Sequence, residues 1–105
     1  MKNEKFFRYP GFLTKACTLS YDDGATDDVR LIEIMRKHGL KGTFNLNSYH
    51  LNGSSPSRLR ANEINDIIGD DTEIALHGYE HLYLSGFSSP IIVRDVLANK
   101  EHLEE

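Results

Sequence analysis

The sequence predicts an α/β fold in which a parallel sheet is built from strands that alternate with helices. Short apolar, β-prone runs alternate with longer segments whose apolar residues follow helical spacing. Glycines or an Asp-Asp-Gly sequence mark the ends of these segments. The order strand, helix, strand, helix, strand, helix implies right-handed crossovers and hence parallel strands. At 105 residues, the chain is expected to form one domain at most.

The first half of the chain contains two predicted strands with a helix between them. Residues 15–21 are apolar and β-prone, and an Asp-Asp-Gly sequence ends this strand. Thr26 or Asp27 can cap the helix that follows, and Gly39 ends it. Residues 41–47 form the second predicted strand. Apolar residues of the helix recur at helical spacing: Val29, Leu31, Ile32, Ile34 and Met35.

The second half repeats this pattern after a polar loop that runs through Ser57. Residues 61–68 form a short helix that Gly69 ends, and residues 72–76 form the third strand. Pro90 suits the first turn of a last helix. Four residues share one face of that helix, and Val93 and Leu97 widen it: Ile92, Val96, Asn99 and Leu103.

Composition and charge argue against several classes of partner. The net charge is -4 and the sequence has no basic cluster, so no nucleic-acid partner is expected. Residues 1–8 contain no long apolar stretch, so we expect no signal peptide, no membrane partner and a cytoplasmic location. Cys17 is the only cysteine, which excludes an intrachain disulfide, and we expect its thiol to be buried in the first strand.

Two polar motifs follow predicted strands and together indicate a divalent-metal site. Asp22 and Asp23 follow the first strand, and His77 and His81 follow the third. Because the carboxyl ends of parallel strands lie at one edge of a sheet, the motifs are expected to meet there. One carboxylate can bind the metal while the other takes a proton from water. Two imidazoles and one carboxylate leave positions open for water and substrate, as in catalytic sites.

Other interpretations of these residues are weaker. An Asp-Asp-Gly sequence can be a turn that caps a helix, and a His-x-x-x-His pair can be incidental. The string HGYEH from His77 also matches the inverzincin pattern, with Glu80 as base, but that pattern needs a helix where Gly78 follows a strand-like run. An EF-hand over residues 22–28 fails because the glycine comes too early and the terminal Glu is absent.

These residues resemble the polysaccharide deacetylases, the NodB-homology family of carbohydrate esterases (family 4-like). The string SYDDG from Ser20 looks like the first motif of that family, Thr/Ser-Phe-Asp-Asp-Gly. The string HGYEH from His77 is similar to the second motif, His-Ser/Thr-x-x-His. Between them, KGTFN from Lys41 resembles the Lys-Ala-Thr-Phe-Phe strand of the family. The resemblance runs from Ala16 to the end of the chain.

The resemblance implies a distorted (β/α) barrel and metal-dependent removal of an acetyl group from the nitrogen or oxygen of a sugar. By motif position, Asp22 would be the general base, and Asp23, His77 and His81 would hold the metal. Zn²⁺ is the first expectation for that metal, with Co²⁺, Ni²⁺ or Mn²⁺ as alternatives. An acetylated carbohydrate would be the substrate.

The sequence departs from the family pattern in two places. Gly78 replaces the Ser or Thr whose hydroxyl would brace the His loop, so that support must come from elsewhere. The later family motifs, which supply an Arg that orients the base and a His that acts as general acid, do not follow the second motif. Barrels of this kind need about 250 residues. We therefore expect residues 1–105 to be a single, truncated N-terminal part of such a domain.

Three hypotheses about function follow from the sequence. The first is a metal-dependent carbohydrate deacetylase that lacks the later catalytic motifs. The second is a module of the same fold that binds metal or sugar without turnover. The third is a structural or interaction protein built on a half-barrel, in which the last strand exposes an apolar edge open to self-association. Metal binding separates the third from the other two, and turnover separates the first from the second.

Overall fold

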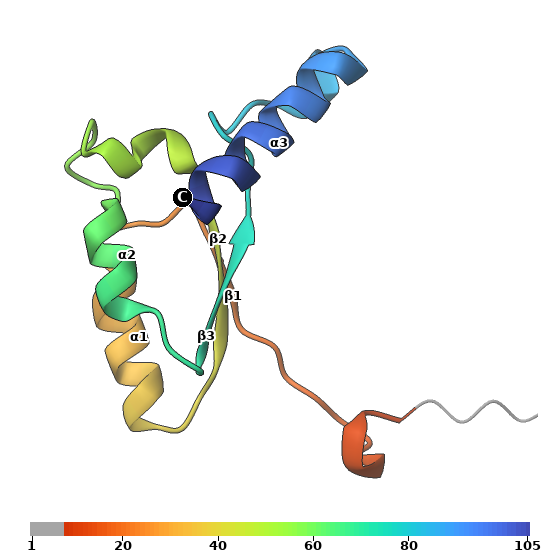
Figure 1. Cartoon of the computed structure of the whole chain (residues 1–105). Helices are drawn as coiled ribbons and strands as arrows, with labels where there is room; N and C mark the ends of the chain where they lie inside the picture. Colours follow the sequence, from red (N-terminus) through yellow and green to blue (C-terminus); the bar gives the residue numbers. More distant parts are fainter. Residues whose placement is uncertain (1–7) are drawn as a thin grey trace, which may run out of the picture.

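The structure is a computed structural model that describes residues 8–105, in which a three-stranded parallel sheet forms. The strands are β1 (Ser20–Asp22), β2 (Gly42–Leu46) and β3 (Thr72–Leu76), in the spatial order β1-β2-β3. The α-helices are α1 (Asp28–Lys37), α2 (Ala61–Ile67) and α3 (Ser89–Glu104). The predicted alternation of helices with parallel strands is therefore confirmed (Figure 1).

The hydrophobic core lies on the side of the sheet where α1 and α2 pack together (Figure 1). β2 is the central strand, and because side chains alternate along a strand, Phe44 and Leu46 both point into this core. Gly42 lets α1 approach closely, since a Cβ there would lie 2.6 Å from the Met35 Cε. The buried apolar residues form one cluster: Ile32, Met35, Phe44, Leu46, Leu59, Ile64 and Ile67.

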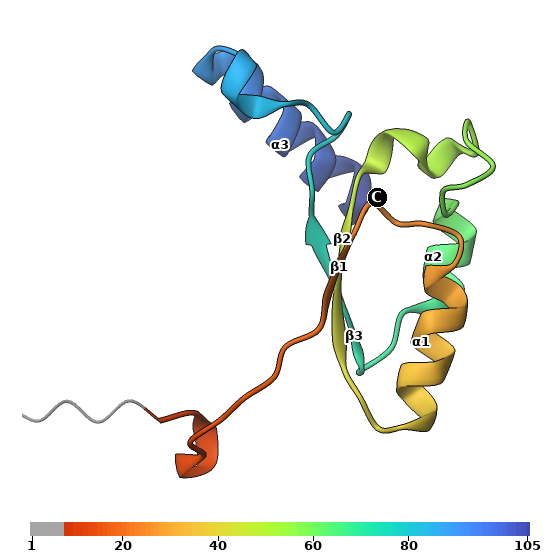
Figure 2. The same ribbon diagram turned by 180° about the vertical axis from the view of Figure 1, so that it is seen from behind.

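α3 packs differently from the other two helices. It contacts β3 and the short 3-10 helix η2 (Ser48–Asn52), and it extends away from the C-terminal end of the sheet (Figures 1 and 2). Its two buried residues are Asp95 and Asn99, both polar. Of the four residues that share a face by helical spacing, Asn99 is buried, Ile92 and Leu103 are half-buried, and Val96 is 38% exposed. The buried face of α3 is therefore centred on Asp95 and Asn99.

The first strand is shorter than predicted. Residues 15–19 precede β1, which begins only at Ser20, and Cys17 is exposed. The reason is the register with β2, in which Ser20 pairs with Thr43 and the Thr43 amide donates to the Leu19 carbonyl. The segment before Leu19 thus passes beyond the start of β2 and finds no strand partner there. Figure 2 shows this segment running away from the sheet.

The remaining predictions about the elements differ from the structure in detail. Asp27 occupies the N-cap position of α1, but its side chain makes no capping hydrogen bond. Part of the predicted polar loop forms η2. Among the described residues, β1 and β3 each pair only with β2, and association through these outer edges stays a prediction.

Within residues 8–105, no helix is long and apolar enough to cross a membrane. The expectation that residues 1–8 form no signal peptide concerns residues that, apart from Arg8, lie outside the described part of the chain.

Candidate metal centre

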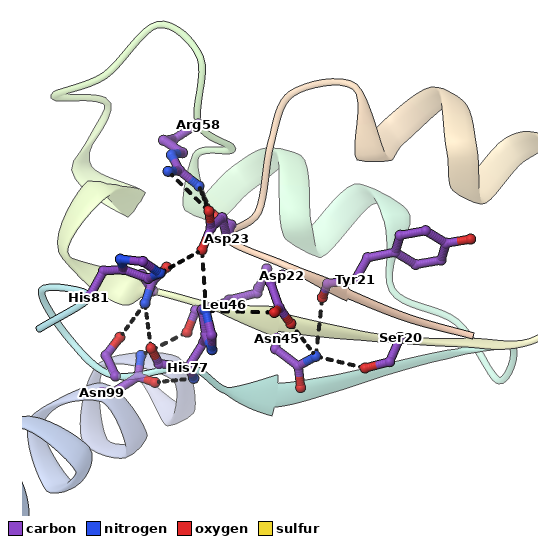
Figure 3. Close-up of polar contacts among 12 residues, drawn as sticks. Ser20, Tyr21, Asp22, Asp23, Asn45, Leu46, Arg58, His77, His81 and Asn99 are labelled. Atoms are coloured by element: carbon purple, nitrogen blue, oxygen red, sulfur yellow. Dashed lines mark hydrogen bonds and ion pairs between the residues drawn. The ribbon is translucent and has the colours of Figure 1, made fainter. Parts of the chain in front are cut away.

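The two polar motifs meet at the C-terminal edge of the sheet, as their positions after the strands predict (Figure 3). Asp22 is the last residue of β1 and pairs in register with Asn45 of β2. Leu46, the next residue of β2, pairs with Leu76, the last residue of β3, so His77 emerges beside the end of β2. The C-terminal ends of the three parallel strands therefore lie side by side, and this brings the two motifs together.

Asp23, His77 and His81 converge on a common point. The Asp23 Oδ1 lies 3.2 Å from the His77 Nε2 and 3.2 Å from the His81 Nε2. The three candidate ligand atoms all lie within 4.8 Å of one another. The His81 side chain is 59% exposed, so the cluster is open to solvent on that side. The structure thus brings together the three residues for which the sequence analysis expects a metal-binding role.

The donor atoms of this cluster fit a divalent cation. The Asp23 Oδ1 is buried, and neither imidazole contact has hydrogen-bond geometry, so this oxygen has no hydrogen-bond partner. A buried carboxylate oxygen without a partner is costly, and a cation beside it would remove that cost. Two imidazole nitrogens and one carboxylate oxygen are also the ligand types of open, catalytic zinc sites. The residues present therefore suit the metal that the donor pattern implies.

Two of the three residues adopt backbone conformations that are uncommon outside glycine. Asp23 has φ 79° and His81 has φ 60°, both in the left-handed region. Asp and His tolerate this region better than branched residues, but it persists only where surrounding contacts enforce it. The contacts around each motif therefore determine where the donor atoms point.

Arg58 holds the Asp23 segment in place. Its Nη1 donates to the Asp23 carbonyl at 2.7 Å, and its Nη2 donates to the Asp23 Oδ2 at 3.4 Å. A backbone bridge between Ala25 and Arg58 joins the same two segments. The guanidinium therefore donates a hydrogen bond to one carboxylate oxygen of Asp23, and the other oxygen, Oδ1, faces the two imidazoles (Figure 3).

Asp22 lies beside the cluster without joining it. Its Oδ2 is 3.9 Å from the His77 Nε2, and its side chain is 60% exposed. Its Oδ1 accepts a hydrogen bond of 2.9 Å from the Asn45 Nδ2, which also donates to the Ser20 hydroxyl at 2.8 Å. Asn45 thus fixes one carboxylate oxygen of Asp22 and leaves the other available to water. The two adjacent carboxylates have different surroundings, as the sequence analysis expected.

The loop that carries the histidines is fixed through its backbone. The His77 amide donates to the Leu46 carbonyl at 3.1 Å and to the Asn99 Oδ1 at 3.0 Å. The Asn99 Nδ2 donates in turn to the Leu46 carbonyl and to the Ser48 hydroxyl. The Asn47 side-chain amide donates to the carbonyls of His77 and Gly78. Buried amide side chains from the junction between β2 and η2 and from α3 therefore hold the start of the loop.

Asp95 supplies the support that Gly78 cannot give. Its carboxylate, on α3, accepts hydrogen bonds from the amides of Tyr79 at 3.0 Å and Glu80 at 3.1 Å. Gly78 has φ 83°, and a Cβ there would lie 2.7 Å from the Asp95 Oδ2. Glycine at position 78 is therefore required both by the backbone conformation and by the close approach of the carboxylate.

Comparison with known proteins identifies the family of the chain. The family model for polysaccharide deacetylase matches residues 11–105. The chain belongs to the polysaccharide deacetylase family. Among solved structures, it is similar to the Streptococcus pyogenes deacetylase PplD in complex with acetate, with a TM-score of 0.78 and 18% sequence identity. The match covers 88% of this chain and 43% of the PplD chain, so the chain spans less than half the length of that deacetylase. No curated protein matches the sequence significantly.

Sequence reasoning found the deacetylase motifs but missed the residues that hold them. Asp95 and Asn99 lie on the last helix, where spacing groups Asn99 with apolar residues on one face and does not mark Asp95. Asn45 stands where the family strand has its last Phe, and its contact with Asp22 depends on a register that only the structure shows. Arg58 lies between the polar loop and the short helix that follows, where no periodic pattern in the sequence marks it.

Proposed function

We propose that this chain forms the metal-binding part of a metal-dependent hydrolase that removes acetyl groups from a carbohydrate. The observation that carries the proposal is the buried Asp23 Oδ1, which has no hydrogen-bond partner and faces the Nε2 atoms of His77 and His81. Membership of the polysaccharide deacetylase family supports the reaction class. The acetate bound to PplD is what a deacetylation releases, and it agrees with the same chemistry.

In this proposal, Asp23, His77 and His81 hold the ion. A bound divalent cation would polarise the acetyl carbonyl and lower the pKa of a neighbouring water. Zn²⁺ is the first choice for this nitrogen and oxygen donor set, and Co²⁺, Ni²⁺ or Mn²⁺ are alternatives. Arg58 and the loop contacts keep the donor atoms pointing at one position before any ion arrives.

Asp22 acts as the general base in the proposed reaction. Asn45 holds its Oδ1, so its Oδ2 is the oxygen that takes a proton from the attacking water. The water oxygen forms a bond to the acetyl carbonyl carbon. The bond from that carbon to the sugar nitrogen or oxygen then breaks, and the proton that Asp22 took from water passes to this leaving atom. The products are acetate and the deacetylated sugar. The exposure of Asp22 gives water and substrate access to this oxygen.

The test of this assignment is turnover by Asp22→Asn compared with the wild type. Both proteins are loaded with Zn²⁺ or Co²⁺ and assayed for acetate release from an N-acetylglucosamine oligomer and from an aryl acetate. We expect the variant to retain the metal and to lose about 10²–10⁴-fold in rate. Asp27→Asn is the matched control, because it removes an exposed carboxylate from the same loop. Wild-type rates in Asp22→Asn would exclude Asp22 as the base.

A non-catalytic module that binds metal or sugar is the second candidate function. The observation that favours this module is the partial match to PplD, which extends over only 43% of the PplD chain. On this hypothesis, residues 1–105 form one part of a deacetylase domain and bind the ion without turnover. A metal-loaded wild-type chain that releases no acetate from either substrate would support the module over the enzyme.

A further inference from the structure

The carboxylate of Asp95 is buried against the backbone of the loop between His77 and His81. The residue is only 6% exposed, yet both of its oxygens have amide partners on that loop. The partners are the consecutive amides of Tyr79 and Glu80, an arrangement that favours an anion. A buried carboxylate with charge-assisted bonds to two amides fixes both the position and the orientation of the peptide groups that donate them.

The position of these amides within the loop is what matters for the histidines. Tyr79 and Glu80 lie between the two imidazole-bearing residues, and His81 follows Glu80 directly. His81 has φ 60°, a conformation that needs enforcement by its surroundings. The Asp95 carboxylate fixes the peptide groups just before this residue, so it sets the direction in which the His81 side chain leaves the backbone.

We propose that Asp95 is a positioning residue for metal binding, and that Gly78 is present to admit its carboxylate. The carboxylate of Asp95 bonds to backbone amides and not to the donor atoms of Asp23, His77 and His81, so it acts through the loop backbone. This inference rests on the proposed metal site. Gly78 and Asp95 act as one structural unit in this inference. A Cβ at position 78 would lie only 2.7 Å from the Asp95 Oδ2, so a side chain there would enter the space of the carboxylate.

The first test measures the affinity for Co²⁺, by calorimetry and by visible absorption, of the metal-free full chain and of Asp95→Asn. Loss of a residue that orients metal ligands weakens binding by about 10–100-fold, and we expect a loss in this range. Glu104→Gln is the matched control, because it removes a carboxylate from the same helix whose partner is Lys100 on that helix. The control is expected to bind Co²⁺ as the wild type does. Wild-type affinity in a folded Asp95→Asn would overturn the proposal.

A second measurement does not depend on a variant that folds. In the metal-free wild type, amide hydrogen exchange reports whether the Tyr79 and Glu80 amides are protected. We expect both amides to exchange slowly, as the loop is already held before an ion binds. Exchange of these two amides at the rate of an unstructured segment would overturn the proposal, because the carboxylate would then not fix the loop.

A coupling measurement separates positioning from a general effect on stability. Gly78→Ala is expected to weaken Co²⁺ binding in the wild-type background, and to weaken it less in an Asp95→Ala background, where the obstructing carboxylate is gone. Equal losses in the two backgrounds would contradict the unit formed by Gly78 and Asp95. A wild-type chain that binds no Co²⁺ would instead overturn the proposed metal site itself, and this inference with it.

Discussion

The side of the sheet covered by α1 and α2 and the end held by α3 are built from different chemistry. The first buries apolar side chains such as Ile32 and Ile64 in one cluster. At the second, α3 buries Asp95 and Asn99, while several apolar residues remain exposed on the same helix: Ile91, Val93, Val96 and Leu97. The comparison teaches that the apolar side supplies stability, whereas the polar end fixes the loop that carries His77 and His81.

The largest expected effect is a loss of stability caused by a cavity in the apolar core. Ile32 is 2% exposed, and Ile32→Ala would remove buried methyl groups and leave a cavity. The free energy of unfolding should fall by about 2–5 kcal/mol. Urea denaturation measures this loss, and the Co²⁺ affinity of the fraction that remains folded should equal that of the wild type. A weakened affinity in that folded fraction would show that the two regions are not separate.

The next largest effect is expected from removing a buried polar side chain at the end of the sheet held by α3. Asn99 is fully buried and bonds the His77 amide, the Leu46 carbonyl and the Ser48 hydroxyl. Asn99→Ala should lower the free energy of unfolding by about 1–3 kcal/mol, since buried polar groups lose their partners. Unlike Ile32→Ala, it should also weaken Co²⁺ binding by the folded protein. Asn65→Ala, on the exposed side of α2, is the matched control. Unchanged affinity in Asn99→Ala would confine the residue to a structural role.

A smaller effect concerns a carboxylate on the apolar side. Burial raises the pKa of Asp28 above its usual value of 3.8, and its Oδ2 has no hydrogen-bond partner. A raised pKa means that the folded state favours the protonated acid. Its stabilising contribution is therefore complete below pH 3.8 and is lost as the pH rises through the raised value. We expect Asp28→Asn to increase stability at pH 7 and to remove this pH dependence.

Urea denaturation between pH 3 and pH 7 tests the prediction for Asp28, with Asp27→Asn as the control. Asp27 is the exposed neighbour in the same turn, and its removal should leave the pH profile as it is. A lower stability of Asp28→Asn at pH 7 would show that the ionised carboxylate of Asp28 is stabilising, through Arg58 or the helix dipole.

The smallest effect lies at the opposite end of the sheet from the metal centre. Arg36 donates from Nε and Nη2 to the two carboxylate oxygens of Asp71, which holds the pKa of Asp71 at about 2. A lowered pKa contributes stability that is present above the usual value of 3.8 and is lost as the pH falls through about 2. Because the pair is exposed, Asp71→Asn should change urea stability at pH 7 least of these variants. A loss as large as that of Ile32→Ala would contradict this ranking.

The sequence was sufficient to predict that the two polar motifs meet, because the ends of strands are easy to recognise. Asp22, Asp23 and His77 each fall at or just after the end of a β-prone run, and parallel strands bring such positions together. The alternation of elements was likewise predictable from apolar spacing. The limits of the first strand were not, because they depend on the register with β2. The prediction of a buried Cys17 is therefore wrong, because the residue lies before β1 and is exposed.

The supports of the site could not be predicted from the same patterns. Helical spacing marks apolar faces, but α3 turns Asp95 and Asn99 inward and leaves apolar residues outside. Gly78 was recognised as a departure from the family, and the need for another support followed from it. Only the structure shows that the support is a carboxylate from a helix that begins after the loop.

The most direct test of the central claim is the metal content of the purified chain, by elemental analysis after reconstitution with Zn²⁺. We predict about one metal ion per chain for the wild type, as expected for a three-residue catalytic site, and none for His77→Ala/His81→Ala. The matched control is His38→Ala/His50→Ala, which removes two histidines outside the cluster and should keep the ion. A wild-type chain without metal, or a His77→Ala/His81→Ala variant that keeps it, would contradict the proposed centre.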